Sequence, residues 1–461
     1  MASESISKSV IWQLIGKFAL QGVAFFTTPV FTRILTPENY GTIALYNSWS
    51  SILMVILSLQ TYGSIPTARI RFSKEEMPAY LSSTLSISVI TYLFVFCVII
   101  FFRDFFVRLF GLNQLLVILL IINSFFGYVI IFYVSYLDQY KEVRKSCLIS
   151  VFSGLGSSLL ALVFVLNINN KVYGKIFGQL IPVVFLGFII LFLVYIKGKV
   201  VWVTEYNKYC IMLTVPLVVH GLGHLVFTQA DRILLQRFQN ESVLGIYSVS
   251  AALCSVLTVI IDSLNRAWVP FYFDFKKAND KESIQFHSKR YLRLMSLIFA
   301  GFILLSFDVF KIMAPEPYWT GIKIIPIFAL SFFFLFLYQF PVNFEYYYEK
   351  TKTIPIATIL VAVINIIFDV CLIPIYSAIG AVFATMISQI LLFLFHYITA
   401  RFLIKEPFDY NFSFFIISIV FVSLVVVLSY FLMDFQYVRW ILFVLVASYV
   451  LYDVLKYRSI F

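Results

Sequence analysis

The stretch Gln114–Leu137, QLLVILLIINSFFGYVIIFYVSYL, contains no charged side chain. A helix needs about 20 apolar residues to cross the hydrocarbon core of a bilayer, so this stretch is long enough to span a membrane. By the same criterion of length, the chain contains about fourteen such blocks. They start near Lys8, Thr42, Tyr80, Gln114, Ser146, Gly174, Tyr209, Val243, Leu292, Ile322, Pro355, Ile379, Asn411 and Tyr437.

Only helices and closed barrels can satisfy every backbone polar group inside lipid. The apolar blocks are continuous and lack the two-residue alternation of a barrel strand, which favours helices. The composition agrees, because 61% of the residues are hydrophobic and 12% are charged, whereas soluble domains contain roughly 25% charged residues. The sequence therefore predicts an all-α polytopic membrane protein with about 14 transmembrane helices.

The net charge of +11 is explained by the excess of Lys and Arg that is typical of the cytoplasmic loops of membrane proteins. The longest predicted loop, residues 266–291, is basic, and we expect it to be a solvated connection on the cytoplasmic side. An even number of spans then places both termini in the cytoplasm. No segment outside the predicted spans is long enough for a folded domain, which argues against nucleic acid as a partner.

An internal duplication is indicated by three pairs of positions that are each separated by about 200 residues. The pairs are Arg33 with Arg232, Gly41 with Gly245, and Gly174 with Gly380. An even number of spans in each copy predicts parallel repeats, related by an axis along the membrane normal. We therefore predict a six-helix lobe over residues 1–200, a second six-helix lobe over 201–405, and two additional helices over 406–461.

Three motifs carry a resemblance to a known family. They are PVFTRILTPENYG at Pro29–Gly41, DRIL at Asp231–Leu234 followed by GIYS at Gly245–Ser248, and the pattern N…IP…GAxxATxxS within Asn365–Ser388. In these motifs the chain resembles O-antigen and capsular polysaccharide repeat-unit flippases (Wzx-type polysaccharide exporters). That family belongs to the larger superfamily that also contains the multidrug (MATE) exporters and the peptidoglycan-precursor flippase. The resemblance implies two six-helix bundles around a central V-shaped cavity, alternating access, and a bacterial cytoplasmic (inner) membrane location.

The first predicted span carries a cation in its interior. Gln13, Lys17 and Gln21 recur at four-residue spacing, which places them on one face of a helix. Polar side chains in membrane helices usually face the bundle interior or water, so Lys17 and Gln21 are candidates for substrate binding. The alternative is that Lys17 extends its ammonium group to the cytoplasmic surface.

The seventh predicted span contains His220 and His224 on one helix face. Their spacing suits a metal, but the residues between them are Gly-Leu-Gly, and the glutamate of a zinc-protease helix is missing. We interpret both histidines as lining of the substrate path, with hydrogen bonding between helices as the alternative. The five cysteines form no close metal-type pair, so we expect no metal and no cofactor.

Asp369 is the deepest acid in the predicted spans and lies four residues after Asn365. It is the candidate for binding a coupling ion, H⁺ or Na⁺, and the alternative is that it pairs with a nearby His or Arg. Histidine titrates near neutral pH, so a role of the histidines in proton coupling is a further hypothesis.

Three classes of function compete. An enzyme requires a catalytic group on a substantial extramembrane loop, which the sequence does not offer. A multidrug or cation antiporter requires carboxylates within its spans, whereas the first six predicted spans contain acids only at their ends. A flippase for a polyprenyl-diphosphate-linked oligosaccharide fits the charge, since Lys17, Arg33 and Arg232 can supply charge-assisted hydrogen bonds to the diphosphate. Polysaccharide polymerase and chain-length machinery are further expected partners, and lipid II is the alternative substrate.

Overall fold

The computed structural model describes residues 26–457 of the chain, apart from the side chains of residues 220, 224, 226 and 227. In this part, twelve helices are long and apolar enough to cross a membrane. A bent helix, in which Thr204–Gly223 and Thr228–Phe238 meet at 49°, raises the number to thirteen. The all-α polytopic fold is therefore confirmed. The first predicted span, from Lys8, lies mainly outside the described residues, so the number fourteen stays a prediction.

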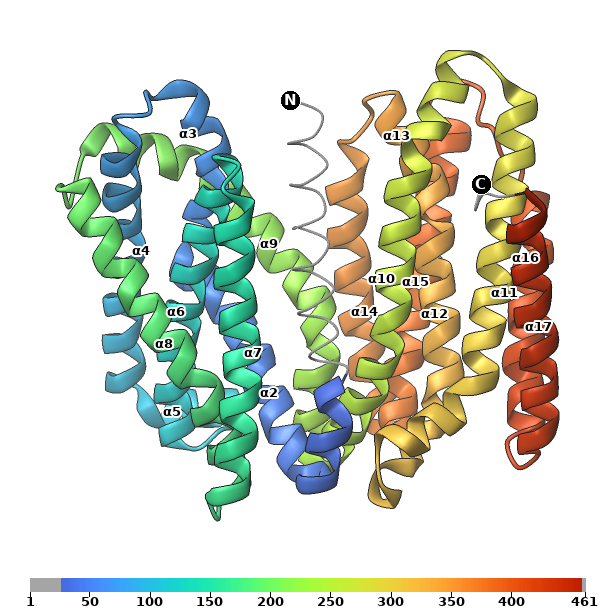
Figure 1. Cartoon of the computed structure of the whole chain (residues 1–461), viewed down its shortest axis with the longest axis horizontal. Helices are drawn as coiled ribbons and strands as arrows, with labels where there is room; N and C mark the ends of the chain where they lie inside the picture. The colour runs from blue at the N-terminus through green and yellow to red at the C-terminus, as the bar shows by residue number, and fades with distance from the viewer. Residues whose placement is uncertain (1–25, 458–461) are drawn as a thin grey trace. The chain divides into compact units, whose positions relative to one another are not determined.

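The chain forms two compact units, Met1–Gly245 and Ile246–Phe461. In the first unit, residues 26–34 are helical and a series of helices follows. They are α2 (Pro37–Ser58), η1 (Thr61–Ser64), α3 (Ile65–Arg71), α4 (Met77–Phe101), α5 (Arg103–Phe110), α6 (Gln114–Gln139), α7 (Val143–Asn167), α8 (Lys171–Gly198) and α9 (Thr204–Phe238) (Figure 1). The helix α8 packs against α4, α6 and α7.

The second unit contains most of α10 (Glu241–Lys277) and all later helices. These are α11 (Lys281–Met313), η2 (Glu316–Ile324), α12 (Ile325–Leu337), α13 (Gln339–Tyr347), α14 (Thr353–Tyr376), α15 (Ala378–Ile398), η3 (Thr399–Leu403), α16 (Phe412–Phe431) and α17 (Gln436–Tyr457) (Figure 1). Its core is rich in fully buried aromatic side chains, among them Trp268, Tyr272, Tyr291 and Tyr410.

The basic segment 266–291 is not the long loop that the sequence predicts. The helix α10 continues to Lys277 and α11 begins at Lys281, so only three residues connect them. The early start of α11 is explained by its cap, because the Asp280 side chain accepts hydrogen bonds from the backbone amide of Ser283 at 2.9 Å and from its hydroxyl at 2.7 Å. These hydrogen bonds hold the pKa of Asp280 below its ordinary value.

The glycines that the sequence pairs across the duplication have matching surroundings. Gly174 begins α8 and lies against the carbonyl of Phe164 near the end of α7, and Gly380 begins α15 against the carbonyl of Leu372 in α14. A β-carbon would lie 2.8 Å from the first carbonyl oxygen and 2.4 Å from the second, so both helical hairpins need glycine for close packing. This equivalence supports the internal duplication, while the boundaries of the predicted lobes stay a prediction.

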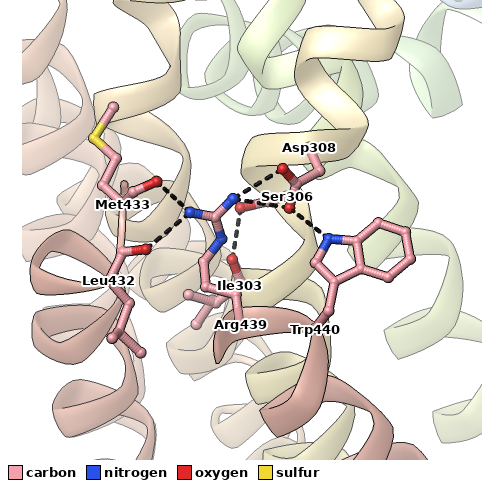
Figure 2. A network of polar contacts seen from close by, with 7 residues as sticks. All are labelled: Ile303, Ser306, Asp308, Leu432, Met433, Arg439 and Trp440. Carbon is pink, nitrogen blue, oxygen red and sulfur yellow. Dashed lines mark hydrogen bonds and ion pairs between the residues drawn. The ribbon is translucent and has the colours of Figure 1, made fainter. Parts of the chain in front are cut away.

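The last two helices are tied to α11 by a buried ion pair (Figure 2). Arg439 of α17 is 1% exposed, and its Nη2 atom donates to both carboxylate oxygens of Asp308, at 2.8 and 2.9 Å. Its Nη1 atom donates to the carbonyl oxygens of Leu432 and Met433 at the end of α16. Trp440 adds a hydrogen bond to Asp308 at 3.2 Å. One arginine therefore satisfies the C-terminal carbonyls of α16 and fixes α17 to α11.

Candidate functional site

The two predicted arginines of the substrate path, Arg33 and Arg232, occupy equivalent positions in their helices. The Nη1 atom of Arg33 donates to the carbonyl oxygen of Pro29 at 2.6 Å, four residues earlier. The Nη1 atom of Arg232 likewise faces the carbonyl oxygen of Thr228, at 3.5 Å, and donates to the Gln229 side chain at 2.7 Å. Each guanidinium group is thus held near its own helix, and its remaining N–H groups are oriented rather than randomly placed.

Tyr40 connects the α2 region to Arg232. Its side chain forms a hydrogen bond with Thr28 and lies within electrostatic range of Arg232. The start of α2 is fixed locally, because Thr36 caps the helix by accepting from the amide of Asn39 at 3.2 Å and Pro37 occupies the first turn. The motif Pro29–Gly41 therefore brings the phenol group of Tyr40 towards the arginine of the second motif.

A third cation of the first unit, Lys175, was missed by the sequence interpretation. Lys175 of α8 is 9% exposed, and its Nζ atom lies 3.1 Å from the centroid of the Phe31 ring. No carboxylate of the described residues lies within ion-pair distance of it. A buried cation within a membrane helix is costly and marks a functional site by default.

Four predicted site residues lie outside what the structure describes. Lys17 and Gln21 precede residue 26, and the side chains of His220 and His224 belong to the undescribed part of α9. Their role in substrate binding stays a prediction. No group of three or more His, Cys, Asp or Glu side chains that could hold a metal ion occurs within the described residues.

Asp369, the predicted ion-binding residue, is fully buried in α14. One turn earlier lies Asn365, which is 1% exposed and whose side-chain oxygen and nitrogen have no hydrogen-bond partner in the described part of the chain. The hydroxyl of Ser388 and the amide oxygen of Gln389, on the neighbouring α15, are likewise buried without a partner. Buried polar atoms of this kind are normally satisfied by water, an ion or a ligand.

Another buried acid of this unit, Glu345, pairs with a histidine. His396 Nδ1 lies 2.7 Å from Glu345 Oε1, and both residues are 0% exposed. The hydroxyl of Thr353 donates to the other carboxylate oxygen at 2.7 Å. The pair joins α13, α14 and α15 where the helices are irregular, since α12 and α13 break at Tyr338 and a π-helical turn follows α15. Glu345 was not among the residues singled out from the sequence.

Comparison with solved structures identifies the fold of this chain. The solved structure of lipid II flippase MurJ in an inward closed conformation superposes with a TM-score of 0.73, at 18% identity, and covers 97% of this chain and 99% of that chain. A multidrug resistance MATE family transporter in an inward-facing conformation gives a TM-score of 0.65 at 14% identity, over 85% of this chain and 98% of that chain. The described helices make the protein a multi-span membrane protein, and its fold is that of these two solved structures.

The family follows from the sequence itself. The model of the polysaccharide biosynthesis protein family matches residues 6–276, which is more than half of the chain. An "Uncharacterized membrane protein" of Haemophilus influenzae is 23% identical over 396 residues, which cover 82% of this chain and 94% of that protein. The chain belongs to the polysaccharide biosynthesis protein family, as the motifs of the sequence predict.

Proposed function

We propose that the protein is a flippase that moves an undecaprenyl-diphosphate-linked oligosaccharide repeat unit, of O-antigen or capsule type, from the cytoplasmic to the outer leaflet by alternating access. The family supports a role in polysaccharide synthesis, and the fold is that of proteins that carry substrates across a membrane. The expected location is the inner membrane of a bacterium, with both termini in the cytoplasm. A polymerase and chain-length machinery would use the product at the outer leaflet.

The observation that carries this proposal is the sign of the charge in the first unit. Arg33, Arg232 and the buried Lys175 are cations within or beside membrane-spanning helices, and α4, α7 and α8 contain no acid. A cationic lining attracts a diphosphate and repels cationic drugs. Lys17 would add a further charge, and Gln21, His220 and His224 would offer hydrogen bonds to sugar hydroxyl groups.

Coupling to an ion gradient is assigned to the second unit in this proposal. Asp369 would bind H⁺ or Na⁺ in the low-dielectric interior, with the buried polar atoms of Asn365, Ser388 and Gln389 nearby on α14 and α15. Neutralisation by Asp369→Asn is then expected to abolish gradient-driven transport without loss of the folded protein.

The proposal is tested in cells that lack the protein, by mass spectrometry of polyprenyl-linked sugars and by an external sugar-binding probe. Accumulation of one complete repeat unit that the probe cannot reach supports the proposal and identifies the sugar. Accumulation of the peptidoglycan precursor would favour the alternative of a lipid II flippase. Normal lipid-linked sugars together with raised sensitivity to cationic drugs would favour a multidrug antiporter.

A further inference from the structure

A groove of about 740 Å³ lies between α11 and α16 in the second unit. It is lined by Gln285, Lys289, Leu292, Arg293, Ser296, Leu297, Asn411, Ser413, Phe414, Ile417, Ser418 and Phe421. The volume lies in the range of pockets that hold a small organic molecule. None of the residues discussed above as candidates for substrate or ion binding contributes to this lining.

The two ends of the groove differ in polarity. Gln285, Lys289 and Asn411 gather where α11 and α16 begin, and Leu297, Ile417 and Phe421 lie further along the two helices. From Asn411 to Phe421 the helix rises by about 15 Å, which is roughly half the 30 Å hydrocarbon core. The groove therefore has the length of one leaflet, with a polar end and an apolar end, as a membrane lipid has.

The charge of the polar end selects an anion. The lining contains Lys289 and Arg293 and no carboxylate. Arg293 shares its charge with Asp453, whose carboxylate it contacts at 2.6 Å, and Asp453 is also held by Arg290 at 2.9 Å. Lys289 is exposed and has no hydrogen-bond or ion-pair partner in the part of the chain that the structure describes. The charge of Lys289 is thus not balanced by a carboxylate of the described residues, and the charge of Arg293 is shared with Asp453.

The start of α16 adds to this potential. The helix has 20 residues, and its N-cap residue, Asn411, makes no side-chain cap hydrogen bond. The positive end of the helix dipole therefore lies at the same end of the groove as Lys289 and favours a negative group there.

We propose that this groove is a binding site for an anionic glycerophospholipid of the bilayer. Its phosphodiester contacts Lys289 and Arg293, and one acyl chain runs between α11 and α16 over Leu297, Ile417 and Phe421. A phosphodiester carries one negative charge, which suits one free and one shared cation. Basic pockets between membrane helices recognise lipid head groups in this way. The bound lipid stabilises the packing of α16 on α11, and the inference does not depend on which substrate the protein translocates.

Native mass spectrometry of the detergent-purified full-length protein tests this site. The protein is incubated with equal amounts of phosphatidylglycerol and phosphatidylethanolamine, and retained lipid is counted. We expect preferential retention of one phosphatidylglycerol and a roughly tenfold weaker retention after Lys289→Gln, since charge-assisted hydrogen bonds are the strong ones. Lys281→Gln, an exposed lysine of α11 outside the lining, is the matched control and should change nothing.

A second variant tests the apolar part of the groove without changing any charge. Ser418→Phe fills the apolar part of the groove and should weaken phosphatidylglycerol retention while leaving the lysines intact. Equal retention of the two lipids, or equal behaviour of the Lys289 and Lys281 variants, would overturn the proposal. Displacement of the lipid by millimolar inorganic phosphate would show a simple anion site. Preferential binding of a polyprenyl phosphate would show a substrate site. Either result would also overturn the proposal of a lipid site.

Discussion

Gly41 of α2 and Gly245 of α10 lie against each other with backbone facing backbone. A β-carbon on Gly41 would lie 2.9 Å from the amide nitrogen of Gly245, and a β-carbon on Gly245 would lie 3.0 Å from that of Gly41. The first would also lie 1.8 Å from the carbonyl oxygen of Glu241, and the second 1.9 Å from that of Pro37. The two glycines that the sequence pairs across the duplication therefore meet at a reciprocal crossing.

Substitution of either glycine by alanine should disrupt this close backbone contact between residues 37–41 and residues 241–245 of the first unit. Because the obstructing atoms are backbone, they cannot move aside as a flexible side chain does. We expect Gly41→Ala and Gly245→Ala each to reduce repeat-unit translocation at least tenfold, measured by surface polysaccharide in complemented deletion cells. Gly156→Ala is the control, since its β-carbon would meet the nearest atom at an ordinary 3.6 Å. Full activity of the Gly41 variant would show that the crossing is dispensable.

Neutralisation of Arg232 should impair transport more than folding. We expect Arg232→Gln to lower translocation about tenfold or more at an unchanged protein level, because a charge-assisted hydrogen bond to a diphosphate contributes about 1.5–3 kcal/mol. Arg232→Lys should restore only part of the rate, since lysine lacks the planar fork of donors. The exposed Arg144, at the start of α7, is the control for Gln substitution. Equal loss in the Arg144 variant would indicate a general effect of surface charge.

Lys175 offers a test that separates function from stability. Replacement by methionine keeps the volume and removes a buried charge that has no carboxylate partner among residues 26–457, so Lys175→Met should leave thermal stability unchanged or raise it. Transport should fall if the cation serves the substrate. Lower stability with normal transport would instead assign the lysine a purely structural role through its contact with Phe31.

The buried pair of Glu345 and His396 should behave as one unit in stability measurements. Removal of one partner leaves the other unsatisfied, so Glu345→Gln and His396→Gln should each lower the free energy of unfolding by about 3–5 kcal/mol. The double variant should lose less than the sum of the single variants, as a thermodynamic cycle in detergent can measure. Thr353→Val, which removes only one hydrogen bond to Glu345, should cost about 1 kcal/mol. Additive losses would contradict a coupled pair.

Much of the fold follows from the sequence because lipid imposes a strict requirement on length and polarity. Uninterrupted apolar blocks, such as the one within Gln114–Gln139, became membrane-spanning helices. The paired glycines were recognisable because close backbone approach allows no side chain.

The residues missed by the sequence interpretation depend on packing that no local pattern encodes. Lys175 lies in the second turn of α8, where a lysine usually reaches the membrane surface, but its side chain is buried and its Nζ atom lies over the Phe31 ring. Glu345 precedes a charged turn in sequence, yet its partner His396 lies 51 residues away. The start of α11 within the basic segment is fixed by the cap at Asp280, which the charged composition of the segment does not reveal.

The most direct test of the central claim uses purified protein in sealed vesicles that contain an undecaprenyl-diphosphate-linked oligosaccharide of the native repeat unit. An external sugar-cleaving enzyme reports how much of the lipid reaches the outer leaflet. We predict that vesicles with the protein expose the protected half of the lipid within minutes, that protein-free vesicles do not, and that the Arg232→Gln protein is at least tenfold slower. Equal protection in vesicles with and without the protein, together with uptake of a cationic dye, would contradict a flippase and indicate a cation transporter.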